Sequence, residues 1–142
     1  MSRSNHKQFI SFGARIRKSP YFDSTIKYGA KAFTIYNRMY MPTAYKGNES
    51  EYHSLVHDVT MWDVAAERQI EINGPDAYDF IRLLTPRNLS NCAIGDCKYI
   101  VLTDEDGFII NDAVLLRLEP NQFWISPGDG DVLLWVQGVA TK

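Results

Sequence analysis

The sequence has few cysteines, no long apolar run and no excess of positive charge. Two cysteines among 142 residues build neither a disulfide framework nor a four-ligand zinc site, which favours reduced thiols in a cytosol. No apolar stretch approaches the roughly 20 residues that a membrane-spanning helix needs. A formal net charge of −2 argues against a nucleic-acid-binding surface, which would be basic. We therefore expect a cytoplasmic protein that binds neither nucleic acid nor a membrane.

Acidic residues are missing from the start of the chain, where Asp23 is the first. The residues before it carry five arginines and lysines. We interpret residues 1–18 as a basic, disordered tail. The alternative is an organelle transit peptide, since such peptides are also poor in acids and contain arginine and serine.

Apolar patterning predicts an α+β fold in the rest of the chain. The order expected from residue 67 is strand, helix, strand, strand, strand and helix. These elements would pack as an antiparallel sheet with helices on one side. They are expected over residues 68–74, 74–86, 97–118 (two strands joined at Asp106-Gly107), 122–126 and 129–140.

The first 60 residues offer less material for a core. A short helix after Ser19-Pro20, a hairpin over 31–43 turning at Asn37-Arg38, and a helix over 48–59 are expected there. A further strand is expected over 61–65 (MWDVA). We divide the chain into the tail, an incomplete start of a first domain over 19–60, and an α+β second domain over 61–142.

Two histidines, His53 and His57, are one helical turn apart in the predicted helix over 48–59. This spacing would let them share a metal ion, but no third ligand is evident and the pattern is not H-E-x-x-H. Histidines that pack or lie on the surface are the favoured interpretation. We predict no metal site.

The segment GFIINDAVLLRL, residues 107–118, raises the main chemical question. Successive side chains on a strand point to opposite faces, so this run is apolar on both faces apart from Asn111 and Asp112. A carboxylate there would be costly unless specific partners hold it or it faces a cavity. Asp112 is either tied to backbone N–H groups at a bulge or rim, or it lines a ligand site.

Four motifs in this order resemble the folate-dependent aminomethyltransferase superfamily, the family of the glycine cleavage T-protein. They are MWDVAAERQIEINGPDA, LLTPRNL, Tyr99 in its strand, and GFIINDAVLL. The segment WDVAAERQ, together with KAFTIYNRMYMPT and QFWISPGDGDVLLWVQGVA, resembles most the dimethylsulfoniopropionate demethylase branch of that family. The resemblance runs from about Lys18 to the end of the chain.

The resemblance implies tetrahydrofolate as cofactor. In the family an aspartate on the matching strand lies beside the pterin and orients the reacting N5, which makes Asp112 the expected catalytic residue. Tyr99 matches a folate-contacting aromatic residue, and Asn111 and Ser126 are further expected cofactor contacts. The T-protein usually has two acids where this chain has Asn111 and Asp112.

The expected substrate is a small methylated sulfonium or ammonium compound. Its methyl group leaves a neutral thioether or amine, so alignment rather than acid catalysis carries most of the rate. Such cations are usually held by aromatic faces, and Tyr36 and Trp62 are the expected substrate contacts. The alternative for each ring is packing in the core.

Family members are more than twice as long as this chain, so we expect an N-terminal fragment that does not turn over substrate alone. Three functions stay open: part of a tetrahydrofolate-dependent demethylase, part of a T-protein-like aminomethyltransferase, or a non-catalytic interaction module. An apolar face left bare by a missing domain would drive self-association.

Overall fold

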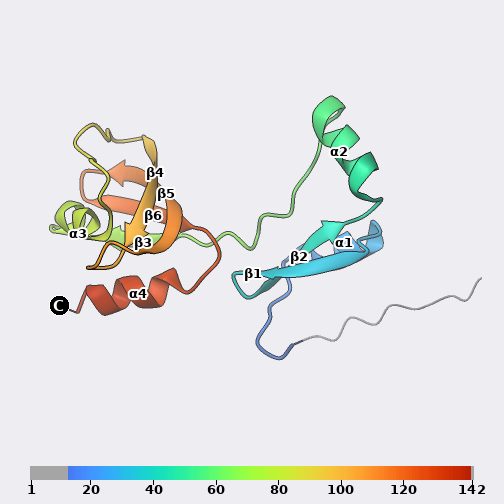
Figure 1. The fold of residues 1–142 in the computed structure, drawn as a ribbon, viewed down its shortest axis with the longest axis horizontal. Coiled ribbons are helices and arrows are strands. Elements are labelled where there is room, and N and C mark those ends of the chain that lie inside the picture. The colour runs from blue at the N-terminus through green and yellow to red at the C-terminus, as the bar shows by residue number, and fades with distance from the viewer. Residues whose placement is uncertain (1–12, 142) are drawn as a thin grey trace, which may run out of the picture.

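The computed structural model describes residues 13–141, so most of the predicted basic tail lies outside the described residues. The chain forms two groups of elements joined by an extended segment (Figure 1). The first group is a two-stranded hairpin with two helices, and the second is a four-stranded antiparallel sheet with two helices. The predicted α+β class is confirmed.

The first group is built around the hairpin that the sequence predicted. Its elements are α1 (Phe22–Lys27), β1 (Ala32–Tyr36), β2 (Met39–Ala44) and α2 (Asn48–His57). The strands are antiparallel and turn at Asn37 and Arg38, whose φ angles of 47° and 58° are those of a type I′ turn. This group has few buried apolar residues, among them Phe22, Met39 and Tyr40. The ring centroid of Phe22 lies 5.1 Å from that of Phe33.

The carboxylate of Glu51 binds the segment that precedes α2, a helix that has no buried residue. It accepts hydrogen bonds from the backbone N–H groups of residues 45, 46 and 47 at 2.7, 2.7 and 2.9 Å. These bonds hold the pKa of Glu51 below its usual range. A lowered pKa means that the carboxylate stabilises the fold above its unfolded-state pKa and that this contribution is lost as pH falls through the lowered value.

We therefore expect the amide signals of residues 45–47 to move together in an acid titration followed by NMR. The midpoint should lie below the ordinary glutamate pKa, because the charged form is the one that is bonded. Glu49→Gln, an exposed change in the same turn, should leave that transition in place, and Glu51→Gln should remove it. A transition that survives Glu51→Gln would contradict the assignment.

The strand predicted over 61–65 is wrong. Residues 58–69 form neither helix nor strand, and Met61 and Trp62 are 98% and 69% exposed. A strand needs a neighbour to pair its backbone groups, and MWDVA has none among the described residues. Asp63 instead forms a turn by accepting the Ala65 N–H at 3.1 Å, and it also accepts the Ser19 hydroxyl.

The second group follows the predicted order of elements. They are β3 (Ile70–Asn73), α3 (Ala77–Leu84), β4 (Cys97–Thr103), β5 (Ile109–Glu119), β6 (Gln122–Pro127) and α4 (Val132–Val139). The sheet order is β3-β6-β5-β4, with every pair antiparallel. The β4–β5 hairpin turns in the predicted region, over residues 104–108: the turn is centred on Glu105 and Asp106, and Gly107 follows it with a φ of 84°.

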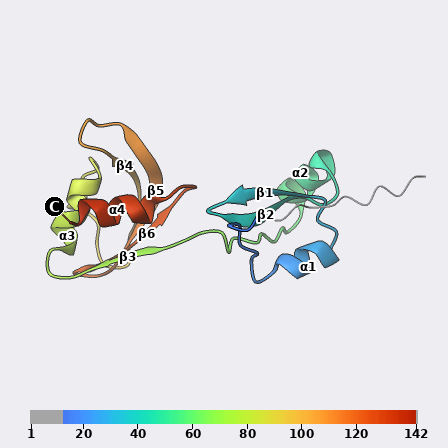
Figure 2. The same cartoon turned by 90° about the horizontal axis from the view of Figure 1, so that it is seen from below.

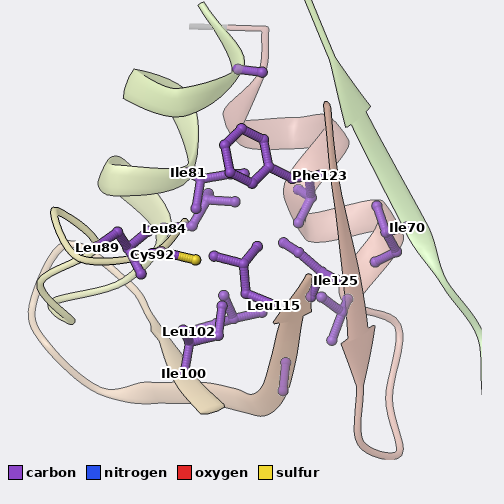
Figure 3. Close-up of a cluster of buried hydrophobic side chains, with 14 residues drawn as sticks. Ile70, Ile81, Leu84, Leu89, Cys92, Ile100, Leu102, Leu115, Phe123 and Ile125 are labelled. Atoms are coloured by element: carbon purple, nitrogen blue, oxygen red, sulfur yellow. The ribbon is translucent and has the colours of Figure 1, made fainter. Parts of the chain in front are cut away.

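One face of this sheet carries the hydrophobic core. The strands contribute Ile100, Leu102, Leu115, Phe123 and Ile125, all nearly inaccessible to solvent, and α3 and α4 add Ile81, Leu84, Val132 and Val136 (Figure 3). Side chains of both helices thus join the core formed by the strands. The opposite face of the sheet is left for other contacts.

Candidate functional site

The two faces of β5 differ in their exposure to solvent. Asn111, Ala113 and Leu115 are buried, whereas Ile110, Asp112 and Val114 are exposed. The strand therefore alternates in burial even though its sequence is apolar on both sides. Asp112 lies on the open face, which answers the question raised by its apolar neighbours: no core surrounds this carboxylate.

Asp112 is paired with Tyr99 of the neighbouring strand. Tyr99 lies opposite Val114, one step along the same face, and its hydroxyl donates to Oδ2 of Asp112 at 2.7 Å. This hydrogen bond is the main cause that raises the pKa of Tyr99, because ionisation removes the proton that the phenol donates; desolvation and the charge of Asp112 raise the pKa further. The pair therefore combines a neutral phenol with a carboxylate acceptor.

Ser126 lies on the same open face, on the other side of β5. It is opposite Val114 in β6 and accepts a hydrogen bond from Nε2 of Gln69 at 3.2 Å. Trp124, two residues earlier, donates its indole N–H to Glu71 at 2.9 Å. We call Tyr99, Asp112, Val114, Trp124 and Ser126 the open face; it spans three strands.

Asn111 does not join these residues. It is buried on the core side of β5, where Nδ2 donates to the Asp129 carbonyl at 3.0 Å and Oδ1 accepts the Gly128 N–H at 2.9 Å. Strand alternation places it on the face opposite Asp112. We therefore replace its expected role as a cofactor contact with a structural one, which is to hold the segment after β6.

Tyr36 reaches this region from the hairpin. Partial burial raises its pKa, and the carboxylates of Glu67, Asp129 and Asp112 raise it further, whereas a hydrogen bond with the Asp129 backbone lowers it in part. The Asp112 charge therefore contributes to the raised pKa of Tyr36, which lies at the end of β1. The Asp112 carboxylate is thus hydrogen-bonded to Tyr99, and its charge also acts on the hydroxyl of Tyr36.

Trp62 does not contact these residues in the described part of the chain. It lies in the extended segment between the two groups, and its indole N–H donates to the Thr60 hydroxyl at 3.0 Å. Its large exposed surface leaves it free to contact a ligand, but no described contact links it to the open face.

The motif reading missed two contributors near Asp112. The sequence identifies Asn37 only as a turn residue, and Asp129 only as part of the helix expected over 129–140. Asn37 binds Asp129 and Gly130 of the loop over residues 128–130, and Gly128 of the same loop donates its N–H to the Asp112 carbonyl. A polar loop directly after a strand end was the signal available in the sequence SPGDGD.

The open face combines hydrogen-bonding and apolar groups. The Asp112 carboxylate can accept further hydrogen bonds beside the Tyr99 ring, and Val114 and Trp124 offer apolar and aromatic contact next to it. Among residues 13–141, no group of three or more His, Cys, Asp or Glu could hold a metal ion. No described helix is both long and apolar enough to cross a membrane.

Residues 21–141 match the family model described as the GCVT N-terminal domain. The chain is 36% identical over 126 residues to dimethylsulfoniopropionate demethylase of Ruegeria pomeroyi, covering 89% of this chain and 35% of that protein. It is 31% identical over 118 residues to a probable aminomethyltransferase of Halobacterium salinarum, covering 81% of this chain and 32% of the relative.

The fold is also known from a solved structure. The glycine cleavage system aminomethyltransferase T of Bartonella henselae matches with a TM-score of 0.73 at 23% identity, over 89% of this chain and 35% of that one. The chain thus spans about a third of the length of the curated relatives it matches.

Proposed function

This chain belongs to the GCVT N-terminal domain family, and on that premise we propose that its open face binds tetrahydrofolate in a one-carbon transfer reaction. The donor would be a methylated sulfonium or ammonium compound and the acceptor N5 of the folate. The hydrogen-bonded pair of Tyr99 and Asp112 supports the proposal most. Tyr99 holds the Asp112 carboxylate in one position, on the face of the sheet that lies opposite the hydrophobic core.

The residues fit the demands of such a reaction. Tetrahydrofolate would supply the secondary amine that accepts the methyl group. Asp112 would fix the orientation of the pterin, and Tyr99 would hold Asp112 in place by donating its hydroxyl. Ser126 would offer a further polar contact from β6. Because the donor leaves as a neutral thioether or amine, these residues would align the reactants rather than protonate a leaving group. The proton on the methylated N5 would pass to solvent.

Tyr36 supports a cationic donor. The ring lies in the field of three carboxylates, those of Glu67, Asp112 and Asp129. An aromatic face in a negative field attracts a sulfonium or quaternary ammonium group. Trp62 would add a second face only if the donor extends to the segment between the two groups.

A T-protein-like aminomethyltransferase is the second candidate. The 31% identity to a probable aminomethyltransferase favours it, and the 36% identity to the demethylase favours the first. The two candidates differ in the group that is transferred: a methyl group of a methylated cation in the first case and an aminomethyl group in the second.

The test is calorimetric titration of the chain with tetrahydrofolate, followed by titration of the mixture with candidate donors. We expect saturable folate binding, and then binding of dimethylsulfoniopropionate but not of an uncharged thioether analogue of it. Absence of folate binding to the folded chain would contradict the proposal. Folate binding without discrimination between cation and thioether would contradict the donor class. Trp62→Ala in the donor titration would show whether that ring takes part.

Gly128 should be a sensitive position for folate binding. A Cβ placed there would lie 3.3 Å from Oδ1 of Asp112, closer than ordinary contact, and the backbone at 128 needs no left-handed conformation. We expect Gly128→Ala to change stability by at most about 1 kcal/mol and to weaken tetrahydrofolate binding several-fold by displacing the carboxylate.

The matched control for this prediction is Gly138→Ala in α4, where a Cβ would meet nothing within 4 Å. It should stabilise the helix by about 0.5–1 kcal/mol without changing folate affinity. Equal affinities for the two variants would show that the Asp112 carboxylate does not contact folate at this point.

A further inference from the structure

The turn of the β1–β2 hairpin is fastened to the loop that follows β6. Asn37 is only 4% exposed. Its backbone N–H donates to Oδ1 of Asp129 at 2.8 Å, and its side-chain Oδ1 accepts the Gly130 N–H at 3.1 Å. Its Nδ2 also donates to the Ala66 carbonyl at 3.2 Å. The hairpin tip therefore points at the second group of elements (Figure 2).

The same loop is fastened on its other side to β5. The Gly128 N–H is shared between the Asp112 carbonyl at 3.0 Å and Oδ1 of Asn111 at 2.9 Å. Nδ2 of Asn111 donates to the Asp129 carbonyl at 3.0 Å. Residues 128–130 thus lie between Asn37 on one side and the Asn111-Asp112 pair on the other, and all of these bonds join segments distant in the sequence.

The turn itself does not need the asparagine side chain. A type I′ turn requires left-handed backbone at Asn37, which glycine adopts more readily than asparagine. The side-chain amide of Asn37 instead forms hydrogen bonds with the backbone of Gly130 and Ala66, outside the hairpin. Tyr36, the preceding residue, has the Asp129 backbone as a hydrogen-bond partner. The bonds of Asn37 therefore act on the surroundings of Asp112.

We propose that Asn37 is a positioning residue, which through the loop over 128–130 fixes Asp112 and Tyr36 relative to each other. Asp129 is its partner in this arrangement. The proposal rests on the proposed function in that Asp112 and Tyr36 are taken as folate and donor contacts. The mechanical part, that Asn37 controls the placement of Asp112, can be measured without any ligand.

The test compares Asn37→Gly with Arg38→Gly in the full chain. Both positions have left-handed backbone, so glycine suits the turn at each. Arg38 makes an exposed ion pair with Asp131, which contributes little. The readout is the pKa of Tyr99 from NMR of tyrosine labelled with carbon-13 in the ring, assigned with Tyr99→Phe, together with tetrahydrofolate affinity by calorimetry.

We expect Asn37→Gly to lower the pKa of Tyr99 toward its value in Asp112→Asn, because the Tyr99–Asp112 hydrogen bond is the main cause of its elevation. Folate affinity should fall by about tenfold, which corresponds to about 1.4 kcal/mol of binding free energy. Arg38→Gly should change neither quantity. A lower melting temperature with an unchanged Tyr99 pKa and unchanged affinity would overturn the proposal.

Substitutions of Asp129 keep the test decisive if Asn37→Gly fails to fold. Asp129→Asn keeps an oxygen acceptor for the Asn37 N–H, and Asp129→Ala removes it. The asparagine variant should retain the wild-type pKa of Tyr99, and the alanine variant should lose it; equal behaviour of the two would overturn the role of the bond. If the wild-type chain binds no folate, the proposed function fails, and the Tyr99 titration still decides the positioning role.

Discussion

Replacing Asp112 with asparagine is expected to weaken tetrahydrofolate binding by about 30- to 100-fold, the loss typical for a hydrogen bond to a charged group. Asp112 is exposed, and its side chain accepts one described hydrogen bond, from Tyr99. The fold should therefore persist, with an unchanged circular dichroism spectrum and little change in melting temperature. Calorimetric titration with tetrahydrofolate measures the effect directly.

The control for this experiment is Asp106→Asn. Asp106 is equally an exposed aspartate of the β4–β5 hairpin, but it lies in the turn. It undergoes the same change of charge, so any general electrostatic effect on folate binding would appear in both variants. Equal affinities for the two variants would make Asp112 a structural carboxylate and would remove the main support for a folate site on the open face.

Replacing Leu115 with alanine is expected to cost about 2–5 kcal/mol of the free energy of unfolding, the range for a leucine removed from a packed core. Leu115 is fully buried in the middle of β5 and lies in the cluster formed with α3 and α4 (Figure 3). Removing its side chain leaves a cavity between the sheet and the helices. Urea unfolding followed by circular dichroism measures the loss.

Leu116→Ala is the matched control, since it changes the same residue type at the next position. Leu116 lies opposite Trp124 on the other side of the sheet and is only half-buried. Its replacement should cost clearly less than that of Leu115, in proportion to the smaller apolar area lost. Similar costs for the two would mean that the open face is covered in solution, as self-association through it would require.

The two pairs of variants distinguish the contribution of the core face of β5 to stability from the contribution of its open face to ligand binding. The core face should respond in stability and the open face in binding. Such a division is expected where one strand supports a core on one side and a ligand on the other, because the rigid sheet positions the binding residues.

The secondary structure follows from the sequence wherever the local signals and the neighbouring elements agree. Asn37-Arg38 and Asp106-Gly107 marked both hairpin turns, since few residues accept left-handed or tight-turn backbone. The apolar stripe of Ala77, Phe80, Ile81 and Leu84 indicated the inner side of α3, on which all but the half-buried Phe80 are buried. Its motifs were also sufficient to indicate the family, to which residues 21–141 belong.

Packing between distant elements sets which of two adjacent polar residues, Asn111 or Asp112, is exposed to solvent. Asn111 and Asp112 are equivalent in the local pattern, and only the packing of α3 and α4 onto one face of the sheet made Asn111 the buried residue. The strand expected over 61–65 failed for a related reason, because pairing depends on a neighbouring strand that local sequence does not reveal. The bonds of Asn37 to Asp129 and Gly130 span more than 90 residues. Contacts at such separation have no local signal, so the placement of Asp112 emerges only when the chain has folded.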